Sequence, residues 1–339
     1  MESSTQNHSP ASHDTAQLME QILYEVKRVV VGQDRFLERV MVAMLAQGHL
    51  LVEGVPGLAK TLTVKTLAST IQGDFKRIQF TPDLVPSDLV GTRIYNQKTG
   101  EFSTSLGPVF TNLLLADEIN RAPAKVQSAL LEVMQERQVT IAGVSHKVPL
   151  PFLVMATQNP IETEGTYPLP EAQVDRFMMK VLVDYPSDEE EFVIVQRVTG
   201  PAVAVSSVAA TGQLAALQSE CRRIYVDPSL VQYAVRLVSA TRDPARHGLK
   251  DLARFITFGA SPRATINLVE GARALAMLRG RGYALPEDLA DLIPDVLRHR
   301  LVLSYEALSE GLGADDLIGK VMAKIPQPAK PLEHEKLAA

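Results

Sequence analysis

The segment Gly54-Val55-Pro56-Gly57-Leu58-Ala59-Lys60-Thr61 decides how this chain folds. It follows an apolar run, His49 to Val52, that is typical of a short buried strand, and it precedes Leu62 to Thr70, which has helical apolar spacing. A strand, a glycine-bearing turn, Lys-Thr and a helix form the arrangement of a phosphate-binding loop. The backbone N–H groups of such a turn, and the helix N-terminus behind them, attract anionic phosphate. We therefore predict that a nucleotide contacts Gly54, Val55, Pro56, Gly57, Leu58, Ala59, Lys60, Thr61 and Leu62.

Two side chains of this loop carry the predicted chemistry. Lys60 would reach the terminal phosphates of a nucleoside triphosphate, and the Thr61 hydroxyl would hold Mg²⁺. The motif usually has glycine directly before the lysine, whereas this chain has Ala59, whose methyl group is small enough to be tolerated. The alternative is an ordinary Gly/Pro turn between a strand and a helix.

Length and composition restrict the class of protein. A chain of 339 residues suggests about two domains with real cores. A hydrophobic fraction of 46% is typical of a soluble globular protein, and the net charge of −5 argues against a protein coated in nucleic acid. Cys221 is the single cysteine, which excludes an intrachain disulfide framework and favours a cytoplasmic location. The polar N-terminus lacks the features of a signal peptide, and no apolar run approaches the roughly 18 residues that a membrane span needs.

The first half of the chain alternates strand-like and helix-like segments. Buried strands are expected at 75–80, 112–116, 152–157 and 177–183, and helices at 16–30, 34–47 and from Pro123 to about 135. Hairpins are expected around the turns Asn96–Gly100 and Gly143–His146. This alternation predicts an α/β fold with a mostly parallel sheet flanked by helices.

The pattern changes at Tyr185-Pro186-Ser187 and is almost entirely helical afterwards. Ser187 and Glu190 form a capping box, so the acidic run 188–191 is predicted to be the first turn of a helix rather than an acidic binding site. Further helices are expected at 211–223, 228–241, 262–279, 286–300 and 315–324. The predicted organisation is a disordered tail (1–15), an α/β nucleotide-binding core (16–186), a helical domain (187–325) and a mobile tail (326–339).

Two acidic residues, Asp117 and Glu118, end the predicted strand at 112–116. Ligands bind open α/β sheets at the carboxyl ends of their strands. Beside a phosphate loop, Asp117 could act at Mg²⁺ and Glu118 could polarise an attacking water. The alternative is that two acids merely end a strand and begin a loop.

Three further polar residues are candidates by position. Asn159 follows the strand at 152–157 and could orient the water or contact the γ-phosphate, although Asn-Pro is also a common turn pair. Arg176 leads into the next strand and could instead pair with Asp175 or Glu171. Arg263 lies in the first turn of a helix, where a cation opposes the helix dipole and thereby favours a specific anionic partner.

Several separated segments resemble, in their order and spacing, the MoxR family of AAA+ ATPases. They are 54–61, 115–123, 156–162 and 259–264. The resemblance covers about 25–325 and implies an AAA+ P-loop core followed by an all-helical lid domain. It also implies ATP hydrolysis, with ATP and Mg²⁺ as cofactors.

The resemblance implies family roles for individual residues. Lys60 and Thr61 would belong to the Walker A motif, and Asp117 and Glu118 to the Walker B motif, with Asp117 acting on Mg²⁺ through water. Asn159 would be sensor 1, Arg263 would be sensor 2, and Arg176 would be an arginine finger that acts on the ATP of a neighbouring subunit. Val31, Gly32 and Gln33 would line the adenine pocket. Whether Arg121 also acts on a neighbouring subunit is left open.

The resemblance further implies a homo-oligomeric ring, a hexamer, with a chaperone-like action. Such a machine remodels or matures a partner protein, or aids insertion of its metal cofactor, beside a separate adaptor with a von Willebrand factor A domain. Hairpins of ring-shaped relatives face the central pore, which makes Tyr95, Lys98, His146 and Lys147 candidate pore contacts. The alternative is that they are solvated hairpin tips.

Two other functions are alternatives to this one. A DNA-dependent motor of the same clade is disfavoured by the acidic net charge, the absence of tryptophan and the lack of an added DNA-binding domain. A nucleotide-binding scaffold without turnover would have no chemical need for Glu118. Nothing in the sequence specifies the client.

Overall fold

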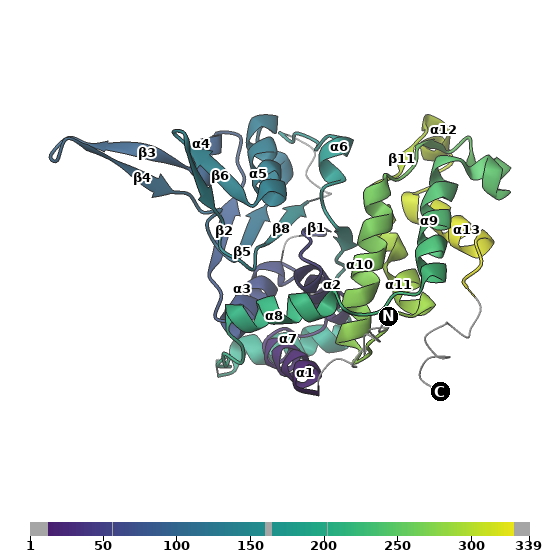
Figure 1. Cartoon of the computed structure of the whole chain (residues 1–339), viewed down its shortest axis with the longest axis horizontal. Coiled ribbons are helices and arrows are strands. Elements are labelled where there is room, and N and C mark those ends of the chain that lie inside the picture. Colours follow the sequence, from purple (N-terminus) through teal and green to yellow (C-terminus); the bar gives the residue numbers. More distant parts are fainter. Residues whose placement is uncertain (1–12, 56, 160–164, 202, 329–339) are drawn as a thin grey trace, which may run out of the picture. The chain divides into compact units, whose positions relative to one another are not determined.

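The computed structural model describes residues 13–55, 57–159, 165–201 and 203–328. The chain forms two compact units (Figure 1). One is Glu20–Ala216, and the other is Leu217–Ala339 together with Met1–Met19. In the described part of the chain, no helix is both long enough and apolar enough to cross a membrane.

A five-stranded parallel sheet forms the centre of the first unit, which confirms the predicted α/β fold. Its strands lie in the order β2-β5-β8-β1-β9. Their bounds are β1 (Leu50–Glu53), β2 (Phe75–Gln79), β5 (Leu113–Asp117), β8 (Leu153–Gln158) and β9 (Met179–Leu182). Because β5, β8 and β1 are neighbours and parallel, the segments that follow them begin at one edge of the sheet.

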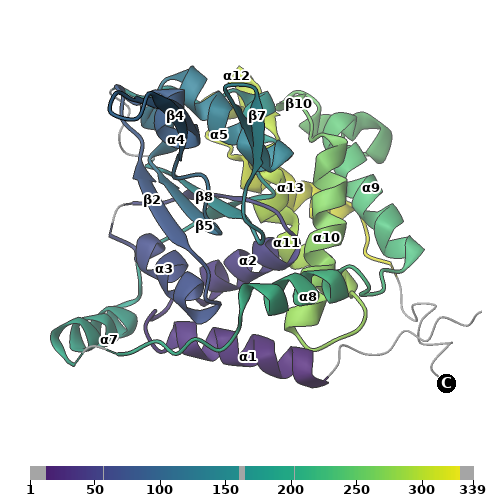
Figure 2. The ribbon, with the colours of Figure 1, turned by 60° about the vertical axis from the view of Figure 1, so that its left-hand side comes forward.

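Helices cover both faces of this sheet. The helices of this unit are α2 (Asp34–Leu45), α3 (Lys60–Thr70), α4 (Pro86–Val90), α5 (Ala124–Glu136), α6 (Glu171–Val174) and α7 (Asp188–Thr199), while α1 (His13–Lys27) and α8 (Thr211–Cys221) contribute to both units. On β5, Leu114 and Ala116 belong to a buried cluster with Leu130 and Met134 of α5. The alternate residues of a strand point to the opposite face, against which α3 packs. Figures 1 and 2 accordingly show α3 and α5 on opposite sides of the strands.

Local sequence explains where several of these helices begin. Ser187 caps α7: its hydroxyl accepts from the Glu190 N–H at 3.3 Å, and the Glu190 carboxylate accepts from the Ser187 N–H at 2.9 Å. The predicted capping box is therefore confirmed. Pro123 is the residue that precedes α5 rather than its first helical residue, so this helix begins one residue later than predicted.

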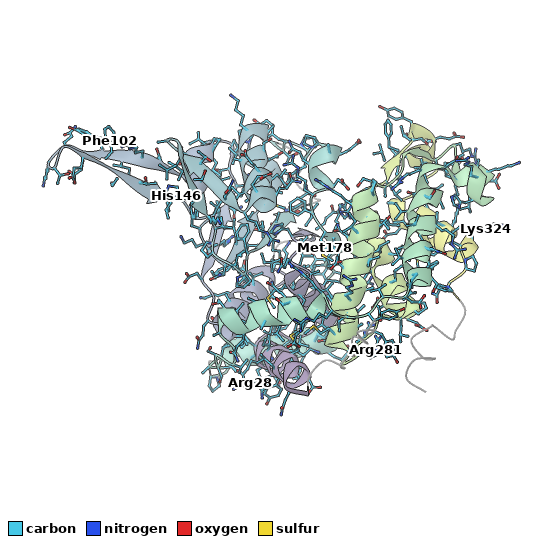
Figure 3. All side chains as sticks on the ribbon, in the orientation of Figure 1. Arg28, Phe102, His146, Met178, Arg281 and Lys324 are labelled. Carbon is cyan, nitrogen blue, oxygen red and sulfur yellow. The ribbon has the colours of Figure 1, made fainter. Side chains whose placement is uncertain are left out.

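The first predicted hairpin is present as β3 (Gly91–Asn96) with β4 (Glu101–Leu106). A second hairpin also forms, β6 (Gln138–Ile141) with β7 (Val144–Lys147), but the turn predicted at Gly143–His146 was wrong. The turn is Ala142-Gly143, where both residues have positive φ, and His146 and Lys147 belong to β7 and pair with Val139 and Gln138 rather than lying at a hairpin tip. The β3–β4 hairpin projects from the unit and carries Phe102, which is 57% exposed (Figure 3). Tyr95 packs against Phe102 with ring centroids 4.9 Å apart and the rings tilted by 49°, and the Arg93 guanidinium lies 4.5 Å from the centre of the Phe102 ring.

The second unit is mainly helical. Its helices are α9 (Pro228–Arg242), α10 (Pro262–Leu278), α11 (Pro286–Leu297), α12 (Tyr305–Ser309) and α13 (Ala314–Lys324), with 3-10 turns at Pro244–His247 and Lys250–Leu252. A short antiparallel pair, β10 (Ile256–Phe258) with β11 (Val302–Leu303), was not predicted. Strands of this length show too few alternating residues to reveal a period.

Candidate active site

Two positions in the loop between β1 and α3 require or favour glycine. A Cβ atom at Gly54 would lie 2.5 Å from the Val183 carbonyl oxygen, so only glycine fits there. Gly57 has φ +88°, a conformation that favours glycine. Val55 is half-buried and is not among the residues that line either pocket described below, and Pro56 lies outside the described residues.

Ala59 caps α3 in the left-handed region, with φ 55° and ψ 12°. This conformation costs an L-residue about 1–2 kcal/mol, which explains why related loops prefer glycine at this position. We expect Ala59→Gly to change the free energy of unfolding by less than about 1 kcal/mol, because relief of strain offsets the greater entropy of the unfolded chain. Ala59→Val should destabilise by about 1–3 kcal/mol, because a β-branched residue tolerates positive φ poorly. Urea unfolding measures both changes, and equal stability of the two variants would contradict a left-handed residue 59.

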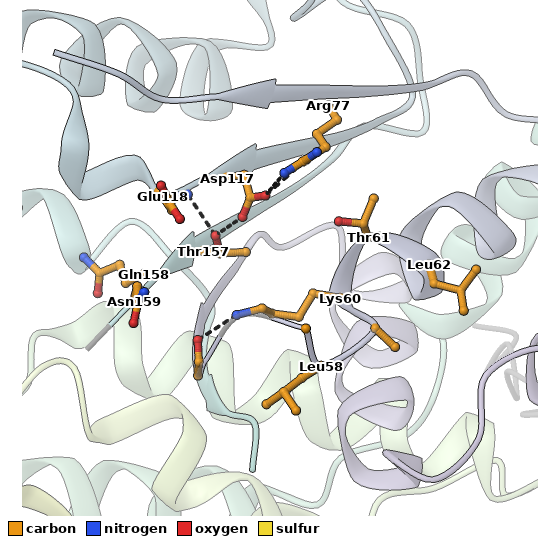
Figure 4. A pocket seen from close by; sticks show the side chains of 13 residues that line it. Leu58, Lys60, Thr61, Leu62, Arg77, Asp117, Glu118, Thr157, Gln158 and Asn159 are labelled. Atoms are coloured by element: carbon orange, nitrogen blue, oxygen red, sulfur yellow. Dashed lines mark hydrogen bonds and ion pairs between the residues drawn. The ribbon is translucent and has the colours of Figure 1, made fainter. Parts of the chain in front are cut away.

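A polar pocket of about 360 Å³ lies between this loop and the carboxyl ends of β5 and β8 (Figure 4). It is lined by Gly54, Gly57, Leu58, Ala59, Lys60, Thr61, Leu62, Arg77, Asp117, Glu118, Thr157, Gln158 and Asn159. The structure thus brings together side chains from three separate segments that the sequence analysis selected.

A second and smaller pocket, of about 90 Å³, shares Gly57, Leu58, Ala59 and Leu62 with the first. Its other lining residues are mostly apolar: Val29, Val31, Gln33, Pro186, Ile194, Arg197 and Val198. A polar pocket joined to an apolar one suits a ligand with an anionic part and a flat, weakly polar part.

Gln33 lines the smaller pocket, and the preceding residue, Gly32, does not. Gly32 has φ +64°, and a Cβ atom there would lie 2.7 Å from the Glu190 carboxyl group. Gln33 also has positive φ, and its Nε2 donates to the Asp184 carbonyl oxygen at 2.9 Å. The Gln33 hydrogen bond joins the segment before α2 to the segment before α7, and Gly32 leaves room for the first turn of α7.

Lys60 lies at the start of α3 and faces the polar pocket (Figure 4). Its Nζ donates to the Gly54 carbonyl oxygen at 2.7 Å. Burial lowers the pKa of Lys60 below its ordinary value, while the carboxylates of Asp117 and Glu118 oppose that shift by favouring the charged form. The hydrogen bond to Gly54 therefore holds the ammonium group beside the pocket.

Asp117 is held through both of its carboxylate oxygens. Arg77 donates to Oδ2 from Nε at 3.1 Å and from Nη2 at 2.6 Å. Thr157, which is buried on β8, donates from its hydroxyl to Oδ1 at 2.5 Å. The carboxylate is thus fixed at the edge of the pocket from two neighbouring strands.

Glu118 is positioned by a separate set of contacts. Its backbone N–H donates to the Thr157 hydroxyl at 2.9 Å, and its φ is 55°. Its Oε2 accepts from Gln79 Nε2 at 2.7 Å and from Arg121 Nη1 of the same chain at 3.1 Å. Thr157 therefore links the two acids: its hydroxyl donates to Asp117 and accepts from the backbone of Glu118.

The remaining candidate residues differ in position. Asn159 follows β8 directly and lines the polar pocket. Arg176 follows α6 and does not line that pocket. Arg263 belongs to the second unit, in the first turn of α10, where its N–H donates to the hydroxyl of the capping Ser261 at 3.2 Å.

Comparison with known proteins identifies the family. Residues 49–179 match the ATPase family associated with various cellular activities (AAA), and residues 250–321 match the AAA lid domain. The chain is 54% identical to the Chaperone MoxR1 of Mycobacterium tuberculosis, over 91% of this chain and 82% of that protein. This chain is a MoxR-family AAA ATPase.

Other relatives of this MoxR-family chain agree with the assignment. It is 34% identical to the Protein MoxR of Paracoccus denitrificans, over 89% of this chain and 94% of that protein. A crystal structure of a protein assigned as an ATPase in Cytophaga hutchinsonii superposes with a TM-score of 0.89 at 48% identity, covering 93% of this chain and 96% of that chain. An AAA core followed by a helical lid is therefore the architecture of this protein, and membership of the family implies ATP hydrolysis.

The sequence analysis of this MoxR-family chain missed Arg77, Gln79 and Thr157. The register of β2 against β5 places Gln79 beside Asp117, and Arg77 precedes Gln79 by two residues and so shares its face of the strand. Arg77 and Gln79 could have been suggested by their position near the carboxyl end of β2, since β2 neighbours the strand that ends at Asp117. Their partners, however, lie about 40 residues away in the chain.

Proposed function

We propose that this MoxR-family protein binds ATP with Mg²⁺ in the polar pocket and hydrolyses it there. The observation that carries the proposal is the convergence of Lys60, Thr61, Asp117, Glu118 and Asn159 on one pocket. The adjoining apolar pocket would receive the base, with Gly32 and Gln33 beside it. Phosphates would lie against the loop N–H groups and the start of α3.

The donor groups of the pocket fit Mg²⁺. The ion prefers oxygen ligands and keeps several waters, which suits the Thr61 hydroxyl as a direct ligand and the Asp117 carboxylate acting through water. When bound, Mg²⁺ would neutralise developing charge on the phosphates.

The chain's own residues would perform the remaining steps. Lys60 would leave the Gly54 carbonyl oxygen and bind the terminal phosphates. Glu118 would accept a proton from the attacking water, and the Asn159 amide would orient that water. Arg263 of the lid would contact the nucleotide as sensor 2, and Arg176 would act on the ATP of a neighbouring subunit.

We further propose that the protein works as a hexameric ring with a chaperone-like action. A relative with 54% identity carries the name Chaperone MoxR1, which supports a chaperone-like role. In that role the protein would remodel or mature a partner protein, or aid insertion of its metal cofactor. An adaptor with a von Willebrand factor A domain would be a separate polypeptide. The exposed β3–β4 hairpin, with Tyr95 and Phe102 at its surface, would contact the client.

Replacing Lys60 tests whether this pocket is the nucleotide site. Lys60→Ala removes a charge-assisted hydrogen bond, and we expect ATP affinity to fall roughly 10- to 100-fold. Lys65→Ala is the matched control, because Lys65 lies on the same helix and is exposed outside the pocket. Titration with a fluorescent ATP analogue measures both affinities. An unchanged affinity in Lys60→Ala would reject the proposed site.

A further inference from the structure

Arg77 contacts the carboxylate of Asp117 from β2 (Figure 4). Its Nε and Nη2 both donate to Oδ2, at 3.1 and 2.6 Å. Its Nη2 also donates to Gln79 Oε1 at 3.0 Å, which fixes the orientation of the guanidinium. With Thr157 on Oδ1, both carboxylate oxygens accept hydrogen bonds from the protein itself.

Thr157 and Arg77 differ in how easily each side chain can move away from the Asp117 carboxylate. Thr157 is only 1% exposed, so its hydroxyl is part of the packed interior. The Arg77 side chain is 50% exposed, against 17% for that of Asp117, so it reaches the carboxylate from the solvent side. Arg77 can therefore move away without unpacking the core, whereas Thr157 cannot.

A divalent cation and Arg77 would compete for the carboxylate of Asp117. An oxygen that already accepts two N–H groups has little capacity left for a metal ion or for its bound water. A guanidinium and a divalent ion a few ångströms apart also repel each other, and a partly buried pair is only weakly screened by salt. Both effects oppose metal binding while Arg77 stays in place.

We propose that Arg77 is a counter-cation that competes with the divalent metal ion for Asp117. In the metal-free pocket, Arg77 balances the charge of Asp117 and fixes its orientation. When the metal–nucleotide complex enters, Arg77 leaves Oδ2 and turns toward solvent. Arg77 is thus a positioning residue that lowers the affinity of the site for the metal. This inference rests on the proposed function, in which Asp117 faces Mg²⁺.

The competing interpretation gives Arg77 a direct contact with the phosphates, since Arg77 also lines the pocket. The two roles predict opposite signs. A phosphate ligand strengthens nucleotide binding, so its loss weakens that binding even without metal. A counter-cation opposes the metal, so its loss strengthens metal binding and leaves metal-free nucleotide binding unchanged.

The test is Arg77→Gln in the full chain, loaded with ADP and titrated with Mn²⁺ as the probe, with the free ion followed by electron paramagnetic resonance. The matched control is Lys76→Gln, which removes one positive charge from the residue that directly precedes Arg77 in β2. The Lys76 Nζ donates to the Phe110 carbonyl oxygen rather than to Asp117. A change in both variants would therefore reflect net charge alone.

We expect Mn²⁺ to bind Arg77→Gln roughly three- to tenfold more tightly than wild type, in line with the modest strength of a half-exposed ion pair. Lys76→Gln should bind it as wild type does, and ADP affinity in EDTA should be the same in all three proteins. Arg77→Lys, which keeps the charge but loses the two-donor contact, should lie between wild type and Arg77→Gln.

Unchanged or weaker Mn²⁺ binding by Arg77→Gln would overturn the counter-cation role, and so would weaker binding of ADP in EDTA. An equal gain in Lys76→Gln would also overturn it. Failure of the wild type to bind ADP is a different result, because it would reject the proposed nucleotide site itself. Should Arg77→Gln fail to fold by circular dichroism, Arg77→Lys carries the same prediction with a smaller gain.

Discussion

Glu118→Gln is expected to bind ATP with near wild-type affinity and to hydrolyse it at least about 10²-fold more slowly. The substitution changes neither the size of the side chain nor its position at the end of β5, but an amide cannot accept a proton from water. Glu118 Oε2 accepts hydrogen bonds from Gln79 and Arg121, and Glu118 lines the same pocket as Lys60. Phosphate release and nucleotide titration measure the two properties separately.

Glu132→Gln is the control for this prediction, because Glu132 is an exposed acid of α5 outside the pocket. It should hydrolyse ATP at the wild-type rate. If Glu118→Gln lost ATP binding, Glu118 would have a structural role through its contacts with Gln79 and Arg121. If it kept full turnover, another group would have to accept the proton.

The same variant offers a route to the client. An ATPase that binds ATP without turning it over stays in its nucleotide-bound form, so bound partners are retained. Purification of Glu118→Gln with ATP from its own cells should enrich the client and the proposed von Willebrand factor A adaptor, relative to wild type. Because a lysate contains many abundant proteins, enrichment has to disappear in the double variant with Lys60→Ala.

The phosphate loop could be predicted because its determinants are local. Gly54, Lys60 and Thr61 lie in one short segment between a buried strand and a helix, and the carboxyl end of a parallel strand accounted for Asp117 and Glu118. Ala59 departed from the usual motif, and the structure gives the physical reason that glycine is preferred there, a left-handed backbone.

The network around the two acids could not be predicted in this way. Arg77, Gln79 and Thr157 act across strands, and their contacts depend on the order and register of β2, β5 and β8. A single sequence shows that each strand exists but not which strands are neighbours. The short pair β10–β11 was missed for a different reason, since its strands are too short to show alternation.

Arg176→Ala is expected to lower ATP turnover of the assembled protein by roughly 10³-fold, as loss of an arginine finger does where it completes a site. Nucleotide affinity should stay near the wild-type value. Arg176 does not line the polar pocket of its own subunit. Lys125→Ala, which removes an exposed cation of α5, is the control and should keep full turnover.

Mixing the two inactive variants separates action within a subunit from action between subunits. In a ring of heterologous contacts, an Arg176→Ala subunit keeps its own Glu118, and a neighbouring Glu118→Gln subunit keeps its Arg176. Sites between such neighbours contain both groups, so equal mixing with free exchange should restore turnover at roughly a quarter of the sites. If Arg176 acted on its own nucleotide, no site in the mixture would contain both groups and turnover would stay at the level of the separate variants. Recovery of activity on mixing would therefore place Arg176 at the site of a neighbour, and its absence would reject that role.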